Sequence, residues 1–433
     1  MTTQPEAKSK GGRRDMQRFL AIALLGAALS VLTVVVPSTT LVRADPSGST
    51  SVLDWNTTAI QLVSAAQQNP IAALRTMAMV HVAIYDAVQA ISTAPSRGFT
   101  GYTVDGARLY GVDPQSSLES ASAAAARTVL LGLFPDKRSD IDAAYATSIA
   151  HVPDTATRQE GILIGDWVAV QILRWRSSDH SNRPDDYNQP VRPGIFQPPG
   201  KSAAVFVYLA GVTPFALQSS AQFRPEPPPA LTSDQYTADY NEVKSLGGAN
   251  SSTRTADETQ AALFWFDNDF YMWNTAARVI AAQKQTTLMG DARLFAELNV
   301  AMYDAMIAVF DAKYTYNFWR PEAAIHNGNS DGNPATIGDP TWTPLRPTAP
   351  HPDYPSAHTA NGGAASTVLA SFFGTDAIRF SFTTRTSPGG AVRSYTSLSQ
   401  AAEEEGLSRI WLGYHFRTAV NVGLTMGQEV GAW

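Results

Sequence analysis

Three short segments near the C-terminus together carry residue types suited to binding a single oxyanion. Arginine and lysine side chains hold such anions through charge-assisted hydrogen bonds, and an imidazole can ligate a metal or transfer a proton near neutral pH. Each segment alone is common, because a lone Lys/Arg pair is usually a solvated helix face. The ordered set supplies three cations, two imidazoles and a hydroxyl, and the set as a whole predicts an anion site. Its members are Lys313, Arg320, Ser356, His358, Arg409 and His415.

The first two cations are expected on one helix. Lys313 and Arg320 are seven residues apart, which is two helical turns, so both side chains would project from the same face. Residues 326–355 follow them and are rich in Asn, Gly and Pro, which indicates a loop. We expect this loop to deliver the next segment to the site.

The second segment is predicted to open a helix. Ser356 precedes a small and apolar run over residues 359–373, and unpaired backbone N–H groups at the start of such a helix attract anions. In the third segment, Arg409 and His415 are six positions apart, so they do not share a helix face. Because Gly413 lies between them, we expect Arg409 to lie before a helix and His415 near its start.

These segments resemble the signature of the vanadium-dependent haloperoxidases and the related acid phosphatases of the PAP2 (phosphatidic acid phosphatase type 2) superfamily. That signature reads K-x6-R-P, then P-S-G-H, then S-R-x5-H. Residues 54–56, 78–87 and 313–321 are also similar to the bacterial haloperoxidase branch. The resemblance extends from about residue 53 to the C-terminus.

The resemblance implies a vanadate cofactor with His415 as its axial ligand through a ring nitrogen. His358 would relay protons to and from the axial oxygen. Hydrogen peroxide and halide would be the substrates, and a small organic acceptor would take up the oxidised halogen. The remaining oxygens of vanadate would be held by Lys313, Arg320, Ser356, the backbone N–H of Ala357, and Arg409.

Two positions depart from the family pattern. Ala357 stands where the signature has Gly, and it keeps the backbone N–H that an anion needs. Ala419 stands where many members place an Asp four residues after the last His. Because such a carboxylate can orient the imidazole, another group must orient His415 here.

Two further residues are candidates for a supporting role. Asp267 matches the family carboxylate that braces the second arginine, although a helix cap or turn is an equal alternative. His351 precedes Ser356 by five positions, where chloroperoxidases tend to carry Phe and bromoperoxidases His. This position favours bromide as the halide.

Two other functions compete with halide oxidation. Phosphate and vanadate share shape and charge, so the same residues suit an acid phosphatase in which His415 attacks phosphorus as the nucleophile. A non-catalytic, secreted oxyanion-binding protein is the other alternative. Halogenation of an activated diketone with vanadate and peroxide would separate the first two functions, and vanadate binding without either activity would indicate the third.

The composition fits a large globular protein. The chain has 433 residues, of which 44% are hydrophobic and 16% charged, enough to bury a large core. A formal charge of −6 argues against nucleic acid as a partner. The sequence has no cysteine, which excludes disulfides and thiol chemistry. It also lacks an H-E-x-x-H zinc motif. The sequence does not define the oligomeric state, and a homo-oligomer is one of the alternatives.

The N-terminus predicts export. Five basic residues precede the apolar stretch 19–36, and Val42-Arg-Ala44 offers a small-residue cleavage site. Residues 1–44 are therefore interpreted as an export signal of a secreted or periplasmic protein, without stable membrane association once cleaved. The alternative is an uncleaved anchor, because about 18 apolar residues can just span a bilayer.

The rest of the chain is predicted to be all-α, as two fused helical bundles. Helical spacing of apolar residues marks six segments. An N-terminal bundle is assigned to 45–180, a Pro-rich connection to 181–230, and a C-terminal bundle with the anion site to 231–433. Residues 82–91 and 300–309 share the core Val-Ala-x-Tyr-Asp-Ala, which suggests a duplication. The six segments are 57–92, 116–134, 156–176, 255–312, 356–374 and 413–431.

Overall fold

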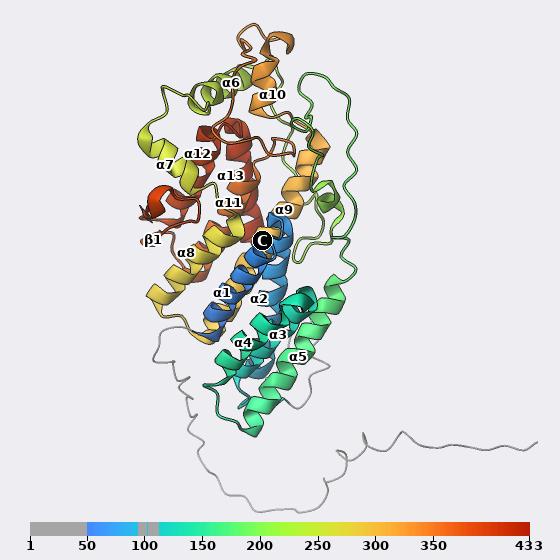
Figure 1. Ribbon diagram of the computed structural model, residues 1–433, viewed down its shortest axis with the longest axis vertical. Helices are drawn as coiled ribbons and strands as arrows, with labels where there is room; N and C mark the ends of the chain where they lie inside the picture. Colours follow the sequence, from blue (N-terminus) through green and yellow to red (C-terminus); the bar gives the residue numbers. More distant parts are fainter. Residues whose placement is uncertain (1–49, 94–101, 103–111) are drawn as a thin grey trace, which may run out of the picture. The chain divides into compact units, whose positions relative to one another are not determined.

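The computed structural model describes residues 50–93, 102 and 112–433, so the predicted signal over 1–44 lies outside it. The described residues belong to one compact unit, Ala44–Trp433. They are mostly helical, which confirms the all-α prediction (Figure 1). Within these ranges the strands are two of three residues each, β1 (Phe380–Phe382) and β2 (Arg393–Tyr395), paired antiparallel.

The helices follow the predicted segments with several subdivisions. The predicted helix over 156–176 has the observed bounds, whereas 57–92 is divided before Pro70 and 255–312 forms three helices. Helices α4, α6, α10 and α12 were not predicted. The first half contains α1 (Ser51–Ala65), α2 (Pro70–Thr93), α3 (Leu118–Leu133), α4 (Arg138–Ile149) and α5 (Ala156–Arg176). The second half contains α6 (Asp234–Leu246), α7 (Ala256–Phe264), α8 (Asp269–Lys284), α9 (Leu288–Tyr316), α10 (Pro321–His326), α11 (Ala357–Phe373), α12 (Leu398–Trp411) and α13 (Arg417–Ala432).

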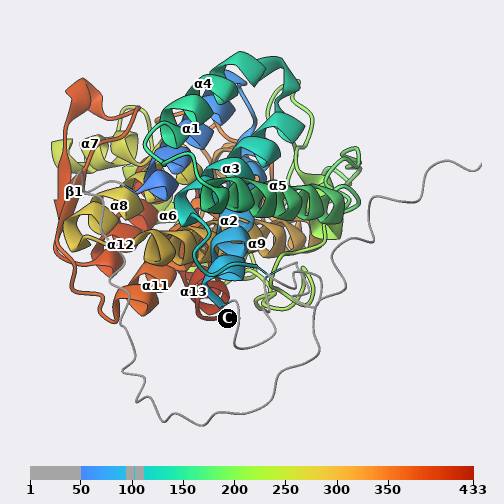
Figure 2. The same ribbon diagram turned by 90° about the horizontal axis from the view of Figure 1, so that it is seen from below.

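Helix α9 is the centre of the core. Most of its residues are buried around the whole circumference, which is typical of a helix enclosed by others. It packs against α2, α11 and α13 (Figures 1 and 2). Its Asp304 is buried and accepts hydrogen bonds from the backbone N–H groups of Phe215, Ala216 and Leu217, at 2.7–3.0 Å. The segment between the two halves is therefore bonded to the central helix.

Glycines allow two helix pairs to pack closely. A Cβ added to Gly423 of α13 would lie 2.5 Å from the carbonyl oxygen of Ser356 at the start of α11. In the first half, a Cβ added to Gly165 of α5 would lie 2.3 Å from the carbonyl oxygen of Ala121 on α3. No side chain fits at such distances, so glycine is what permits these approaches. The α11/α13 contact fixes the position of Ser356.

The predicted internal repeat has a structural counterpart. Asn56 of α1 and Asn274 of α8 are 218 positions apart and are joined by a hydrogen bond of 2.7 Å. The same spacing relates His81 of α2 to Asn299 of α9: His81 is bonded to Asn56 at 2.8 Å, and Asn299 to Asn274 at 2.9 Å. All four side chains are buried. Because α2 packs along α9, the halves share this core, and the proposed domain boundaries stay a prediction.

One described helix, Pro70–Ser92, is long and apolar enough to cross a membrane. In its most apolar window, 83% of the residues are buried inside the protein. This is the behaviour of a core helix.

Candidate oxyanion site

The three predicted segments meet at the C-terminal end of α9. The ring nitrogen Nε2 of His415 lies 3.1 Å from Nη1 of Arg320, and Lys313 and Arg409 are close enough to perturb the same imidazole. The side chains come from the last turn of α9, the start of α10, the last turn of α12 and the loop before α13. At most 3% of any of these residues is exposed: Lys313, Arg320, Ser356, Arg409 and His415.

The two cations of the first segment are not on one helix, contrary to the expectation. Helix α9 ends at Tyr316, and Asn317 adopts a left-handed conformation with φ of 51°. The chain then turns, and Arg320 is the residue that precedes α10. Seven-residue spacing predicts a shared face only while the helix continues, and here the turn brings both cations to the site instead.

Lys313 and Arg320 are held by backbone oxygens of the loop that precedes α11. Nζ of Lys313 donates to the carbonyls of Pro352 and Asp353, at 2.6 and 2.8 Å. Nε of Arg320 donates to the carbonyl of His351 at 2.7 Å. Burial, together with Arg320, lowers the pKa of Lys313 well below its ordinary value, and burial lowers the pKa of Arg320 to about 10. Burial thus disfavours both positive charges, and a bound oxyanion would offset this penalty.

Arg409 precedes α13, near whose start His415 lies, as expected, but Arg409 itself lies in the last turn of α12, a helix that was not predicted. Its Nη1 donates to the carbonyl of Trp265 at 3.1 Å, while its buried Nε has no hydrogen-bond partner. Burial lowers the pKa of Arg409. A buried guanidinium with an unused N–H donor is costly unless an acceptor arrives, which fits an anion as the missing partner.

Asp353 is a site residue that the sequence analysis missed. Its Oδ1 lies 2.8 Å from Nδ1 of His415, at ion-pair distance but without the alignment of a hydrogen bond. The carboxyl is fully buried, and burial raises its pKa to about 7 against the opposing effect of Arg320 and Lys313. Many family members have an Asp at the position of Ala419, and that carboxylate can orient the imidazole. In this protein Asp353 provides the carboxyl group beside the imidazole instead. The only signal was an acidic residue in the loop three positions before Ser356.

The N-terminus of α11 is where the sequence predicted it. The helix begins at Ala357, and Ser356 precedes it without a hydrogen bond from its side chain to the backbone N–H groups of the first turn. The Ser356 hydroxyl accepts a hydrogen bond from Oγ1 of Thr359 at 2.8 Å. The backbone N–H groups of a first turn have no partner within their own helix, so they are available to an anion, together with the Ser356 hydroxyl.

His358 lies one residue further, at the edge of the site, with 24% of its side chain exposed. Its Nε2 lies 3.2 Å from the backbone oxygen of Asp267 and 3.6 Å from Oδ1 of Asp269. Burial, and then Arg409, lower the pKa of His358 to about 4, while Asp269 opposes the shift. The imidazole is neutral at pH 7, with Nε2 directed to these oxygens.

Asp267 does not brace Arg409. Its carboxylate holds Arg385, which donates from its backbone N–H at 2.8 Å and from Nε at 3.0 Å. Arg385 follows the strand β1, more than 100 positions away from Asp267, so local sequence could not reveal the pairing. Asp267 contacts the site through its backbone oxygen, which faces His358, and its carboxylate opposes the lowering of the His358 pKa.

His351 contacts the site directly. Its Nδ1 lies 3.0 Å from Nη2 of Arg320, and its ring packs against Phe310 with centroids 5.0 Å apart. Burial, followed by Arg320 and Lys313, lowers the pKa of His351 well below its ordinary value. His351 is therefore a neutral imidazole against a cation, at the position where the halide preference was expected to lie.

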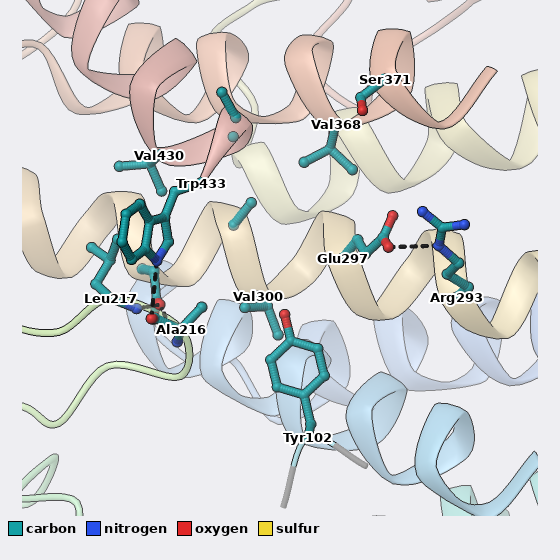
Figure 3. A pocket seen from close by; sticks show the side chains of 14 residues that line it. Tyr102, Ala216, Leu217, Arg293, Glu297, Val300, Val368, Ser371, Val430 and Trp433 are labelled. Atoms are coloured by element: carbon teal, nitrogen blue, oxygen red, sulfur yellow. Dashed lines mark hydrogen bonds and ion pairs between the residues drawn. The ribbon is translucent and has the colours of Figure 1, made fainter. Parts of the chain in front are cut away.

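A separate pocket of about 230 Å³ shares no residue with this site (Figure 3). Its lining includes Val300, Val368 and the indole of Trp433. Arg293 is its cation, and Nε of this arginine is paired with Glu297 at 2.7 Å. The pocket therefore offers no unpaired cation to an oxyanion.

Together, the fold and the site define a class: mostly helical proteins with a buried, cation-lined anion site that contains a histidine. Residues 293–433 match the family described as the VCPO second helical-bundle domain. The vanadium chloroperoxidase of Curvularia inaequalis is 26% identical over 404 residues, covering 74% of this chain and 65% of that protein. This chain thus corresponds to less than two thirds of the length of that relative.

Solved structures agree with these matches. A bacterial vanadium-dependent iodoperoxidase superposes with a TM-score of 0.72 and 26% identity, over 88% of this chain and 94% of that one. A bacterial vanadium-dependent chloroperoxidase superposes with a TM-score of 0.66 over 84% and 91% of the chains; at 19% identity, this likeness concerns the fold. By sequence and by fold, the chain is similar to vanadium haloperoxidases, and residues 293–433 match their second helical-bundle domain.

Proposed function

We propose that this protein is a vanadate-dependent haloperoxidase that oxidises halide with hydrogen peroxide to hypohalous acid. The observation that carries the proposal is the convergence of three buried cations on the imidazole of His415. Kinship with a chloroperoxidase and an iodoperoxidase supports it. A small organic acceptor would then be halogenated.

The residues of the site suit vanadate. Lys313, Arg320 and Arg409 would neutralise its oxygens, assisted by the Ser356 hydroxyl and the N–H of Ala357. Nε2 of His415 faces Arg320 while Nδ1 faces Asp353, so Nε2 is the nitrogen available as a metal ligand. Bound vanadate would supply a Lewis acid that activates peroxide.

His358 is proposed as the group that moves protons. With a pKa near 4 in the anion-free protein it is a base at neutral pH. A polyanion at the site would raise that pKa, because opposite charge favours the protonated imidazole. His358 could then accept a proton and return it within one turnover.

Bromide is proposed as the preferred halide. The supporting observation is the neutral imidazole of His351 against Arg320 and Phe310. Parallel assays with chloride, bromide and iodide would test this. A wild-type preference for chloride, unchanged in His351→Phe, would refute it.

An acid phosphatase with His415 as nucleophile is the second candidate. Asp353 favours it, because a carboxylate beside Nδ1 can support an attacking imidazole. The same arrangement also serves a metal ligand, so geometry does not separate the two. A third candidate is an oxyanion-binding protein without turnover.

One experiment decides among the three. Metal-free protein would be supplied either with vanadate, peroxide and bromide, or with a phosphate ester, and both diketone halogenation and phosphate release measured. Vanadate-dependent halogenation is expected, with at most slow ester hydrolysis. Ester hydrolysis alone would establish the phosphatase, and vanadate binding without either reaction would establish the binding protein.

We also propose that residues 1–44 direct export and that the mature protein is secreted or periplasmic. The basic residues and the apolar stretch 19–36 support this. N-terminal sequencing of the protein recovered outside the cytoplasm should begin near Asp45. Retention of the full chain in the membrane would favour the anchor, and size measurement would establish whether the protein is a homo-oligomer.

A further inference from the structure

Two buried carboxyl groups lie behind His358 and have no part in binding the oxyanion. Asp269 opens α8 and Glu405 lies on α12, with 6% and 0% of the residue exposed. Oδ1 of Asp269 lies 3.6 Å from Nε2 of His358. Acidic side chains are seldom buried unless they are paired, so the pair needs a physical account.

The hydrogen bonds of the pair leave one oxygen of each residue without a donor. Oδ2 of Asp269 accepts from Nδ2 of Asn361 at 2.9 Å, and Oε2 of Glu405 accepts from the indole N–H of Trp273 at 2.8 Å. The remaining oxygens, Asp269 Oδ1 and Glu405 Oε1, are buried without a partner, and the two carboxyl groups are close enough to interact with each other. If both groups were ionised, two acceptors would face each other. One proton between them satisfies both.

The surrounding charges indicate which group keeps the proton. Asp269 faces His358, and Arg409 interacts electrostatically with the carboxyl groups of both Asp269 and Glu405. The nearby Asp267 carboxylate is neutralised by Arg385. Burial, and then Asp269, raise the pKa of Glu405 well above its ordinary value.

We propose that Glu405 stays protonated at neutral pH and donates a hydrogen bond to Asp269. Asp269 is then the anion that stabilises the protonated form of His358. The inference rests on the proposed function of His358. During turnover His358 gains and loses one proton, and no covalent bond is formed. Without Asp269, the protonated imidazole would face Arg409 with the Asp267 carboxylate, itself paired with Arg385, as its remaining nearby counter-charge, and proton transfer would become slower.

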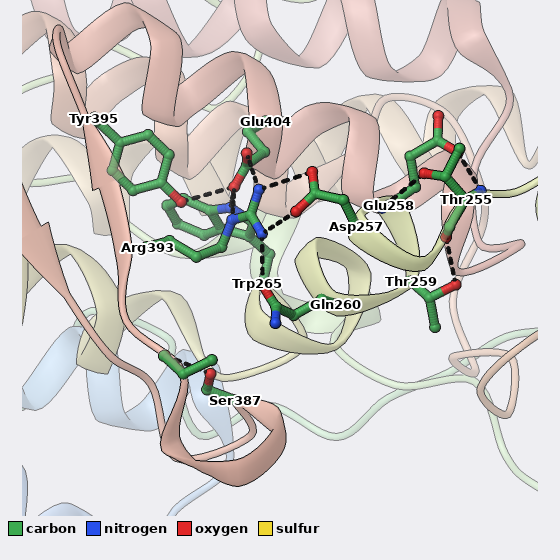
Figure 4. A network of polar contacts seen from close by, with 11 residues as sticks. Thr255, Asp257, Glu258, Thr259, Gln260, Trp265, Ser387, Arg393, Tyr395 and Glu404 are labelled. Carbon is green, nitrogen blue, oxygen red and sulfur yellow. Dashed lines mark hydrogen bonds and ion pairs between the residues drawn. The ribbon is translucent and has the colours of Figure 1, made fainter.

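The adjacent residue Glu404 supplies a matched control. It also accepts a hydrogen bond from an indole, that of Trp265 at 2.9 Å. It is, however, paired with Arg393 and bonded by Tyr395, both at 2.7 Å (Figure 4). Glu404 is therefore in direct contact with a cation. The two glutamates share a helix and the type of indole partner, and differ in their proposed protonation.

The test measures the pKa of His358 by NMR in histidine-labelled protein, with assignment from His358→Gln, and the pH profile of halide oxidation. Asp269→Asn should lower the His358 pKa by about one unit and reduce turnover roughly tenfold at neutral pH. Glu405→Ala should perturb both quantities, and Glu405→Gln should restore them, because glutamine imitates a neutral, donating carboxyl group. Glu404→Gln should change neither.

Two results would overturn the inference. If Glu405→Gln lowered the His358 pKa as much as Asp269→Asn does, Glu405 would be ionised in the native protein. If Asp269→Asn left both the His358 pKa and the pH profile unchanged, Asp269 would not be the counter-ion. A wild-type protein without halide oxidation would defeat the proposed function, while the NMR comparison would still decide the protonation of the pair.

Discussion

The helix pairs α3/α5 and α11/α13 are built alike, yet the candidate anion site lies at the second pair. Each pair begins with a serine ahead of its first helix, Ser117 and Ser356. In each, a glycine on the partner helix faces that serine: a Cβ added to Gly161 or Gly423 would lie 2.5 Å from its carbonyl oxygen. The backbone framework is thus present twice.

The side chains around the two serines differ. The Ser117 hydroxyl caps its own helix by accepting from the N–H of Ser120 at 3.2 Å, and it donates to Glu119 at 3.2 Å. Ser356 makes no such cap, and His358 stands at the position that Glu119 holds in the first pair. A helix N-terminus attracts anions only where its donors are not already occupied and no carboxylate competes. The comparison teaches that the surrounding residues, more than the helix opening, create the site.

The largest effect is expected from removing the cations that other elements bring to the second pair, from α9, from the residue before α10 and from α12. Lys313→Ala, Arg320→Ala and Arg409→Ala should each weaken vanadate binding by roughly 2–4 kcal/mol, because each cation neutralises charge on a dehydrated anion. Equilibrium dialysis with vanadate measures the loss. Ser117→Ala, in the first pair, serves as the control and should bind like wild type. Unchanged binding in all three variants would show that the site lies elsewhere.

The two histidines of the site should separate into ligand and proton carrier. His415→Ala should lose vanadium altogether, whereas His358→Ala should keep it and lose most halide oxidation, roughly 10²-fold or more. Vanadium content and turnover are measured on the same preparations. The reverse pattern would exchange the two roles.

Substitution of Gly161 and Gly423, the glycines that face the two serines, should separate the effect on folding stability from the effect on vanadate binding. Gly161→Ala and Gly423→Ala each force a methyl group against a carbonyl oxygen, which costs about 1–3 kcal/mol of folding free energy. Urea denaturation should show comparable losses in both variants. Gly423→Ala alone should also weaken vanadate binding, since it displaces Ser356. Equal binding losses in the two variants would contradict this assignment.

At neutral pH the smallest effect concerns His81, where the second half has Asn299. Burial lowers the pKa of His81 to about 3, so below pH 6.5 the unfolded chain binds a proton that the folded protein does not. His81 therefore lowers the free energy of unfolding by about 1.4 kcal/mol per pH unit as the pH falls from about 6.5 towards 3. His81→Asn should flatten this dependence, as measured by urea denaturation at pH 7, 5 and 4. A parallel slope in both proteins would mean that His81 does not titrate between the two states.

Local sequence alone determined the helical class and one functional element of the site. The run after Ser356 predicted a helix N-terminus, and α11 begins at Ala357. Helix α5 has the predicted bounds, 156–176. These features depend on residues within a few turns of one another, so spacing and capping are sufficient to reveal them. The family signature likewise identified the cations and histidines before any coordinates.

Only the tertiary structure decided which groups these residues face. Asp353 reaches His415 across the fold, Asp267 pairs with Arg385, and Glu405 meets Asp269. Each pairing joins residues from separate elements, and burial raises the pKa of Asp353 and of Glu405. The spacing of Lys313 and Arg320 predicted one helix face, but a left-handed residue at Asn317 ended the helix between them. These pairings and the end of α9 depend on long-range packing, which no local sequence pattern predicts.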